Sequence, residues 1–176
     1  SPTYNESENI TELCKRIFKI KKKVDLLIID DNSPDGTSDI VKKIKKRNRN
    51  LILIKRKSKL GIGSAFRIGI KYAIENKYNT LVTLDADLSH QPEEIPKLLL
   101  KLKKNDFVIG SRFVTGGKSS YTGYRRIVSK IANIVCRLVL NINLHEFTTS
   151  FRAYNYKCLK ILHSLPVLSE GYSSFM

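Results

Sequence analysis

Four short, mainly apolar stretches alternate with stretches whose apolar residues recur at helical spacing, and this alternation restricts the fold more than any other feature. The apolar stretches are VDLLII (24–29), LILI (51–54), LVTL (81–84) and FVIG (107–110). Strands buried on both faces read as continuous apolar runs. The pattern therefore predicts an α/β fold with a mostly parallel sheet covered by helices on both faces, in which ligands bind at the carboxyl ends of the strands.

The helices are placed by the spacing of their apolar residues. Asn5 and Glu8 fit the first and fourth positions of a capping box before the first helix, and further helices are expected at 40–44, 63–74 and 95–102. At 176 residues, the chain fits a single domain, 1–176. We expect this domain to be a fragment that lacks the start of its first strand and a C-terminal part.

Two of the predicted strands end in carboxylates. Asp85 and Asp87 follow LVTL, and two carboxylates two residues apart can hold one hard cation that bridges to phosphate oxygens. An EF-hand loop is excluded, because His90 and Pro96 stand where its Gly and Glu are required. The alternative interpretation is that these aspartates only cap a helix or shape a turn.

The other acidic strand end is IIDDNSPDGTSD (28–39). Asp31 could accept hydrogen bonds from a ribose hydroxyl or a base, whereas Asp35 is expected to shape the turn. KLGIGSAFRIG (59–69) is not a dinucleotide fingerprint, because Phe66 replaces its third glycine. No GKS or GKT occurs, which argues against a P-loop ATPase.

The net charge of +16 raises the question of a polyanionic partner. The basic runs KIKKK, KKIKKRNRN, KRKSK and KLKK contain no aromatic residue on which bases could stack. Nucleic acid is therefore not expected, and the charge is either a solvated face or contacts an anionic membrane surface. No apolar run reaches the roughly 18 residues of a membrane span.

Seven segments together resemble the family-2 inverting glycosyltransferases of GT-A fold, and among them the dolichyl-phosphate (polyprenyl-phosphate) mannose synthases. The segments are PTYNE (2–6), IIDDNSPDGT (28–37), KLGIGSAFRIG (59–69), LDADLSHQPEEIP (84–96), GSRF (110–113), RRIVSKIAN (125–133) and FTTSFRAY (147–154). The resemblance implies a transferase that moves mannose from GDP-mannose to a polyprenyl or dolichyl monophosphate with inversion. It also implies a cytoplasmic protein, peripheral on the cytoplasmic face of a membrane.

The resemblance implies a donor site whose residues come from four motifs. Those expected to border the nucleotide, or to hold its base or ribose, are Pro2, Tyr4, Glu6, Ile29 and Asp31. Those expected to meet the donor diphosphate and a divalent cation, Mg or Mn, are Asp85, Ala86 and Asp87. Ser89 stands where some relatives have a metal-binding Gln. Arg112 and Arg126 are expected to bind phosphates, and with Asp87 form the catalytic set.

The acceptor is expected to bind after the stretch FVIG. VTGGKSSYTGY (114–124) is suited to a mobile lid. In the following helix, Ile127, Ile131, Ile134 and Leu138 form a stripe that is expected to be core rather than membrane contact. A lipid monophosphate is already anionic at neutral pH, so no strong general base is required. His90, His145 and His163 show no catalytic pairing, and His90 is expected to be structural.

Two alternatives remain open from the sequence. One is a family-2 glycosyltransferase that uses another nucleotide sugar, of the UDP-glucose type, or a glycan acceptor that needs a general-base carboxylate. The other is a non-catalytic domain that binds a nucleotide sugar without turnover.

Overall fold

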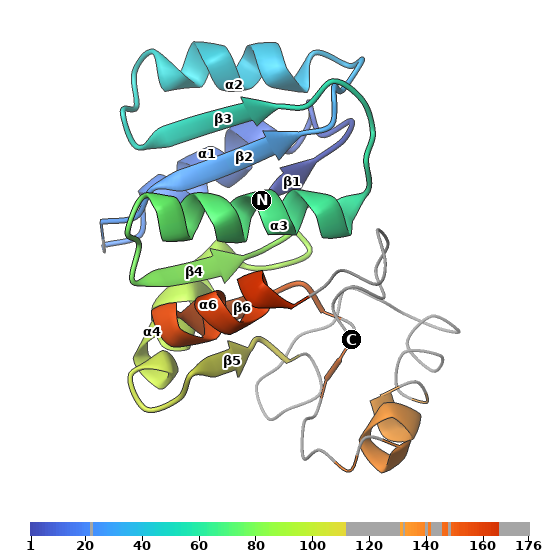
Figure 1. The fold of residues 1–176 in the computed structure, drawn as a ribbon. Helices are drawn as coiled ribbons and strands as arrows, with labels where there is room; N and C mark the ends of the chain where they lie inside the picture. Colours follow the sequence, from blue (N-terminus) through green and yellow to red (C-terminus); the bar gives the residue numbers. More distant parts are fainter. Residues whose placement is uncertain are drawn as a thin grey trace.

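A parallel three-stranded sheet forms the first half of the molecule (Figure 1). The computed structural model describes residues 1–21, 23–111, 131, 133–139, 141, 146–147 and 149–165. In this sheet β1 (Pro2–Thr3) pairs with β2 (Leu26–Asp30), and β2 pairs along its whole length with β3 (Leu51–Lys55). The observed strands β2 and β3 confirm two of the apolar stretches as strands.

A second three-stranded sheet has the order β4-β6-β5. It contains β4 (Thr80–Thr83), β5 (Phe107–Ile109) and β6 (Arg152–Asn155), and β6 runs antiparallel to both neighbours. The apolar runs predicted β4 and β5 but not β6. Only Ala153 and Tyr154 of β6 are apolar in character, so the strand gives no apolar run.

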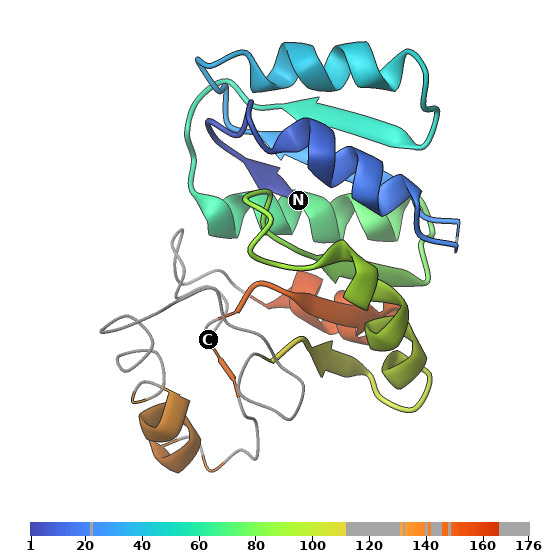
Figure 2. The same ribbon diagram turned by 180° about the vertical axis from the view of Figure 1, so that it is seen from behind.

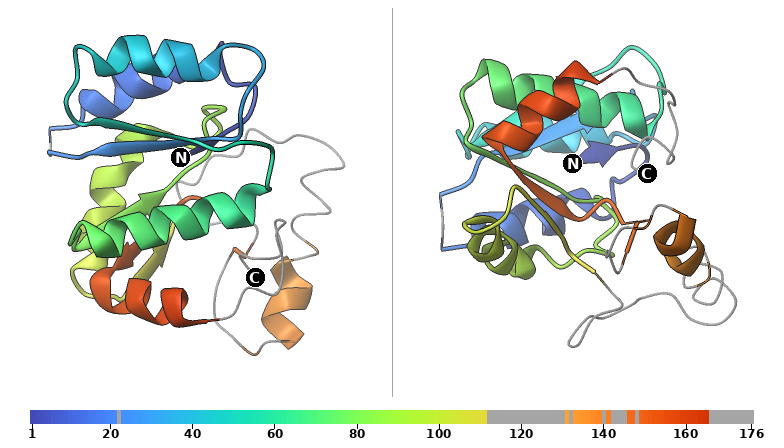
Figure 3. Two further views of the ribbon diagram at one scale, coloured as in Figure 1. Left: turned by 45° about the horizontal axis from the view of Figure 1, so that its top comes forward. Right: turned by 60° about the horizontal axis from the view of Figure 1, so that its bottom comes forward.

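Helices cover both faces of the sheets (Figures 1 to 3). Figure 1 has α3 (Ile62–Glu75) and α6 (Tyr156–Ser164) in front, and these two helices pack together. Figure 2 has α1 (Ile10–Phe18), the short η1 (Pro92–Glu94) and α4 (Ile95–Leu102) in front. The helix α2 (Thr37–Lys45) packs on α1 and β3. Within the described residues, no helix is long and apolar enough to cross a bilayer.

The two sheets share one hydrophobic core. Its fully buried members include Ile10 and Leu13 from α1 and Ile28 from β2, and the same cluster extends to Phe151 and Ala153 beside β4. Each fully buried side chain of this size contributes about 1.5–3 kcal/mol. The helical stripes of α1 and α4 therefore pack where their spacing predicted.

The predicted capping box at Asn5 is wrong. The helix α1 begins at Ile10, and its N-cap Asn9 makes no side-chain capping hydrogen bond. Asn5 instead has a positive φ of 60°, and its backbone N–H donates to Ser33 Oγ at 3.0 Å. The Asn5 turn thus ties the chain after β1 to the loop after β2.

Candidate functional site

Carboxylates gather at the edge of the sheets where β1, β2 and β4 end. The arrowheads of these strands point to the same side in Figure 1. Glu6 follows β1, Asp30 and Asp31 lie at the end of β2, and Asp85 and Asp87 follow β4. The predicted placement of both acidic motifs at one edge is therefore confirmed.

Glu6 lies in the electrostatic field of the aspartates after β4. Burial is the main cause that raises the pKa of Glu6, and the charges of Asp87, Asp85 and Asp35 raise it further, against a hydrogen bond from Asn9. The backbone N–H of Glu6 donates to Thr37 Oγ1 at 3.0 Å, which holds the turn toward α2. The edge therefore concentrates negative charge from three separate segments.

The Asp85 carboxylate fits a cation. Its Oδ1 is buried and has no hydrogen-bond partner within the described residues. Burying a carboxylate oxygen without a partner is costly unless a cation or donor satisfies it. In the described part of the chain, no group of three or more His, Cys, Asp or Glu side chains could hold a metal ion. A divalent cation on Asp85 and Asp87 would therefore take its remaining ligands from a diphosphate and water.

The loop that carries Asp85 and Asp87 is rigidly shaped. Leu88 has a positive φ of 62°, a conformation costly for a residue with a Cβ. The backbone N–H of Ser89 donates to Asp87 Oδ1 at 2.9 Å, closing a tight turn. The structure thus gives Ser89 a contact with the aspartate through its backbone.

His90 anchors this loop to the segment before β6. The backbone N–H of Asp85 donates to His90 Nδ1 at 3.1 Å, so the ring proton lies on Nε2 and is shared with Thr149 Oγ1 at 3.1 Å. The imidazole also stacks on Phe151, with ring centroids 5.2 Å apart and planes 14° apart. The expected structural role of His90 agrees with these contacts.

Asp31 is held in a buried ion pair with Arg56. The guanidinium of Arg56 bonds to the Asp31 carboxylate and to Ser64 Oγ, and it donates to Gly61 O at 2.9 Å. Leu60 N–H donates to Asp31 Oδ2 at 3.2 Å. Asp31 and Arg56 together shape the loop between β3 and α3, where Gly61 has a positive φ of 85°.

Asp30 and Asp35 organise the loop between β2 and α2. Burial acts to raise the pKa of Asp30, but hydrogen bonds from Ser33, Ser38 and Thr3 outweigh it and lower the pKa. Asp35 Oδ1 accepts from the backbone N–H of Thr37 at 3.0 Å. The expectation that Asp35 shapes the turn agrees with this contact.

Among the residues expected to border the donor, Ile29 and Ala86 have buried side chains, and Pro2 is half-buried. Pro2 and Ile29 line a cavity of about 590 Å³ between β2 and β4. Ala86 is 2% exposed and belongs to the core, so only its backbone can face the edge. Tyr4 is 38% exposed, with Lys59 Nζ 4.0 Å from its ring centroid.

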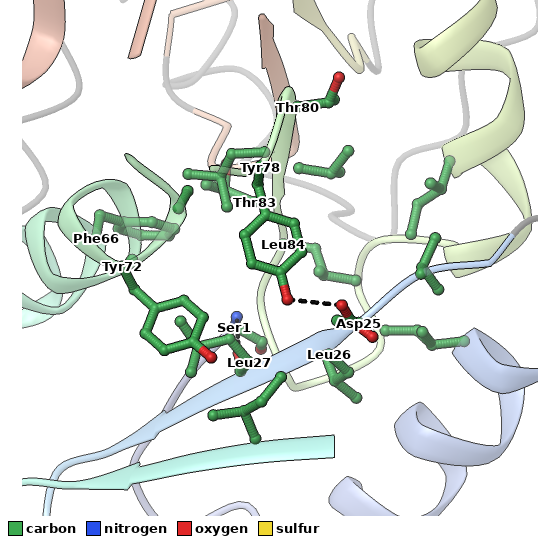
Figure 4. Close-up of a pocket in the computed structure, with 18 of the residues that line it drawn as sticks. Ser1, Asp25, Leu26, Leu27, Phe66, Tyr72, Tyr78, Thr80, Thr83 and Leu84 are labelled. Carbon is green, nitrogen blue, oxygen red and sulfur yellow. Dashed lines mark hydrogen bonds between the residues drawn. The ribbon is translucent and has the colours of Figure 1, made fainter. Parts of the chain in front are cut away.

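The cavity is a partly open space with mainly apolar walls, and neither Asp85 nor Asp87 lines it (Figure 4). Phe66 and Tyr72 project into it from α3, and Leu26 and Leu27 line it from β2. The Tyr78 hydroxyl donates to Asp25 at 2.6 Å across its wall. Because Asp85 and Asp87 do not line it, the cavity is not the candidate site.

Several expectations concern residues on which the structure gives no information. Arg112, Arg126 and the 114–124 loop lie outside the described residues. The stripe of the following helix is described in part, and there the expectation was wrong. Ile131, Ile134 and Leu138 are 55%, 45% and 75% exposed, not buried in the core.

Sequence reasoning missed two sets of residues at this edge. Arg56 was taken as one member of the basic run KRKSK, although its place directly after β3 put it beside the end of β2. Thr149 and Arg152 form the other set. Arg152 donates to Phe147 O at 2.6 Å and to Thr149 O at 2.7 Å, and so holds the segment that bonds His90.

The strand and helix arrangement defines an α/β protein, and the carboxylates around the unpartnered Asp85 oxygen make its carboxyl edge the candidate site. Residues 1–162 match the model of glycosyl transferase family 2. The chain belongs to this family of glycosyltransferases, as the sequence motifs predicted.

Two relatives match almost the whole chain. An undecaprenyl-phosphate mannosyltransferase of Micrococcus luteus is 36% identical over 172 residues, which are 97% of this chain and 71% of the relative. A polyprenol monophosphomannose synthase of Mycolicibacterium smegmatis is 37% identical over 174 residues, which are 97% of this chain and 66% of that protein.

Solved structures share the fold. The mannosyltransferase PcManGT from Pyrobaculum calidifontis, solved in complex with GDP-Man and Mn²⁺, aligns with a TM-score of 0.65 and 18% identity. It is matched over 98% of this chain and 48% of its own. TarS 1-349 of S. aureus aligns with a TM-score of 0.62 and 19% identity, over 91% of this chain and 47% of its own. The predicted GT-A fold is confirmed, and the chain spans about half the length of these structures.

Proposed function

We propose that the protein transfers mannose from GDP-mannose to a polyprenyl monophosphate with inversion at the anomeric carbon. The names of the two relatives, both at more than a third identity, support mannose and a polyprenyl phosphate as the two partners. A mannosyltransferase of the same fold was solved with GDP-Man and Mn²⁺, which supports the donor and a divalent cation. The reaction would take place at the cytoplasmic face of a membrane.

The observation that carries the proposal is the buried, unpartnered Asp85 Oδ1 beside Asp87. A bound divalent cation would be held by Asp85 and Asp87 and would stabilise the charge that develops on the departing diphosphate. His90 and the Ser89 turn keep the two carboxylates in place before the donor arrives. Ser89 is proposed to contribute through this turn or as a further ligand.

The donor nucleoside is proposed to lie along the ends of β1 and β2. Tyr4 and Glu6 would border it from the turn after β1, and the Asp31–Arg56 pair would fix the loop on its other side. Pro2 lies beside them, and Ile29 and Ala86 can contribute through their backbones, since their side chains are buried. Arg112 and Arg126 are proposed to bind phosphates of donor or acceptor.

The acceptor phosphate is the nucleophile. One of its oxygens forms a bond to the anomeric carbon while the bond from that carbon to the diphosphate oxygen breaks, and GDP leaves with the electron pair. A phosphate monoester is largely dianionic near pH 7, so no side chain has to remove a proton. This fits an edge whose only described histidine, His90, has its Nδ1 occupied by the Asp85 backbone.

Asp87→Asn tests the proposal. The variant should retain the fold, because the side chains are nearly isosteric and Asp87 is exposed at the sheet edge. Turnover of GDP-mannose with a polyprenyl phosphate should fall by at least about a hundredfold, and EDTA should abolish wild-type turnover. Asp39→Asn is the matched control, since Asp39 is an exposed carboxylate on α2 paired with Lys42. Undiminished turnover by Asp87→Asn, or in EDTA, contradicts the metal assignment.

A further inference from the structure

Arg16 of α1 bridges to the segment that follows residues 85–90, which we call the acidic loop. Its Nε donates to Glu93 Oε1 at 2.8 Å, and its Nη2 donates to Glu93 Oε2 and to Gln91 Oε1, each at 2.5 Å. The partners lie 75 and 77 residues away in the sequence, and α1 and η1 pack together on one face of the molecule (Figure 2). The planar guanidinium therefore binds the carboxylate with two hydrogen bonds and keeps a third for the neighbouring side-chain amide.

This bridge differs from the other ion pair of α1. The Arg16 side chain is only 20% exposed, and its hydrogen bond lowers the pKa of Glu93, which keeps that carboxylate charged at neutral pH. Lys15 reaches Glu12 of the same helix at 3.5 Å, with side chains that are 60% and 48% exposed. Isolated exposed pairs contribute little, whereas a bidentate Arg–carboxylate pair can hold two segments in a fixed geometry.

The bridge fixes the far end of the acidic loop. His90, the last residue of this loop, accepts from the Asp85 backbone and is itself held by the segment before β6. Gln91 comes next, and its carbonyl accepts from the backbone N–H of Glu94 at 3.0 Å, where η1 forms. The loop is thus held on one side through His90 and on the other through Arg16. It cannot shift as a unit without breaking one of these contacts.

The helix α1 also begins at the turn that carries Glu6. The Glu6 carbonyl accepts from the backbone N–H of Asn9 at 3.1 Å and from that of Ile10 at 2.9 Å, so the turn leads directly into the helix. Ile10 and Leu13 are fully buried, which anchors α1 in the core. The Glu6 turn and Arg16 are therefore two points on one rigid element.

We propose that Arg16 is a positioning residue that sets the spacing between the Glu6 turn and the acidic loop. This inference rests on the proposed function, in which the turn borders the nucleoside and the loop holds the metal-bound diphosphate. A donor contacts both at once, so a loop that drifts away from α1 would bind the cation and the diphosphate more weakly. Arg16 touches no reacting atom and acts through Gln91 and Glu93.

Arg16→Met tests the inference, because methionine keeps the apolar stem and removes the three hydrogen bonds. Hydrogen exchange of a peptide that covers the acidic loop should become at least about threefold faster. The Mn²⁺ affinity, measured by calorimetry, should fall about threefold to tenfold, which is less than for a residue that bonds a metal ligand directly. Lys15→Met is the matched control. It breaks the exposed pair within α1 and should change neither quantity.

A double-mutant cycle shows whether the bridge itself is responsible. Glu93→Ala should weaken Mn²⁺ binding as Arg16→Met does, and the double variant should bind no more weakly than the weaker single variant. Arg16→Lys should recover part of the affinity, because an ammonium group can bond Glu93 but cannot reproduce the planar fork. A residue that only packs against η1 would give additive losses and no recovery by lysine.

Equal Mn²⁺ affinity of Arg16→Met and the wild type overturns the inference, and so does unchanged hydrogen exchange of the acidic loop. A lower melting temperature without these two changes would mean that Arg16 only joins α1 to η1, which also overturns it. Neither assay uses a sugar donor or an acceptor. If the wild type shows no turnover but Arg16→Met shows both effects, the proposed reaction fails and the positioning role of Arg16 is supported.

Discussion

His90 joins two segments that lie 59 residues apart, the loop of Asp85 and Asp87 and the segment that enters β6. It is a positioning residue, because it contacts the backbone of a carboxylate residue rather than any reacting atom. Its Nδ1 fixes the Asp85 amide, and its Nε2 fixes Thr149. Hydrogen bonds that orient metal-binding residues in this way typically change metal affinity by roughly 10–100-fold.

His90→Ala should therefore weaken Mn²⁺ binding by about tenfold or more, even in preparations that remain folded. His90→Asn should recover part of this loss, because an Asn Oδ1 can accept from the Asp85 amide where Nδ1 does. The measurements are Mn²⁺ titration by calorimetry and the separate effects on kcat and KM for the donor. If Ala and Asn lower the melting temperature alike and leave Mn²⁺ affinity unchanged, His90 only packs the core.

Asp31→Asn is predicted to lower the free energy of unfolding as well as to weaken binding of the donor nucleotide. The side chains of Asp31 and Arg56 are 8% and 4% exposed, so the substitution leaves a buried guanidinium without its counter-charge. Such a change costs about 3–5 kcal/mol of unfolding free energy. Asp39→Asn, which breaks an exposed pair with Lys42, should change the free energy of unfolding far less, because solvent screens that pair. Urea unfolding measures the free energy of unfolding of both variants. Equal, small losses in the two would contradict a stabilising role for the buried Asp31–Arg56 pair.

The sequence predicted where Asp31 and Asp85 lie in the fold but not which side chains they contact. Asp31 and Asp85 could be assigned to the ends of strands because each follows an apolar run. The partner of Asp31 lies 25 residues away, in a run of five mostly basic residues, and only the β2–β3 register brings Arg56 beside it. Contacts that depend on register cannot be read from local pattern.

At the scale of elements, α3 shows how closely a helix can approach the sheet. Gly69 lies in the middle of α3, and a Cβ built there would meet Ile29 Cδ1 at 3.7 Å, an ordinary contact. Gly110 follows β5, and a Cβ there would come within 2.4 Å of the Phe151 ring. Gly110 therefore cannot carry a side chain unless Phe151 moves, whereas Gly69 has room for a methyl group.

Gly69→Ala is predicted to stabilise the protein by about 0.5–1 kcal/mol, because alanine favours the helix and fills space beside Ile29. Gly110→Ala should destabilise it, since the Phe151 ring that stacks on His90 would have to move. Thermal and urea unfolding measure both changes. A destabilised Gly69→Ala would indicate that α3 cannot take even a methyl group against β2.

The helix at 133–139 illustrates a limit of periodicity. The spacing of Ile131, Ile134 and Leu138 defines a face but does not say what the face contacts. The orientation of the helix is set by Asn133, which accepts a buried hydrogen bond from the Phe147 backbone. This contact joins residues 14 positions apart and cannot be read from the local sequence. A stripe predicted as core was therefore found exposed.

At the scale of the whole molecule, alternation predicted the α/β class, four strands and the helices between them. It could not predict β6, which comes from a distant segment and inserts antiparallel between β4 and β5. The resemblance to family-2 glycosyltransferases supplied what alternation could not, and the family match agrees with it. The domain boundaries remain a proposal.

The cavity between β2 and β4 has a consequence for how the molecule responds to pressure. The space of about 590 Å³ between β2 and β4 is partly open and has mainly apolar walls, which hold water weakly, so filling it with water lowers the volume of the system. Compression therefore favours states in which β2 and β4 separate and water enters between them. Pressure should therefore act first on the seam between β2 and β4, whereas the Asp85–His90–Thr149 contacts hold together two segments of the second sheet, the loop after β4 and the strand entry before β6.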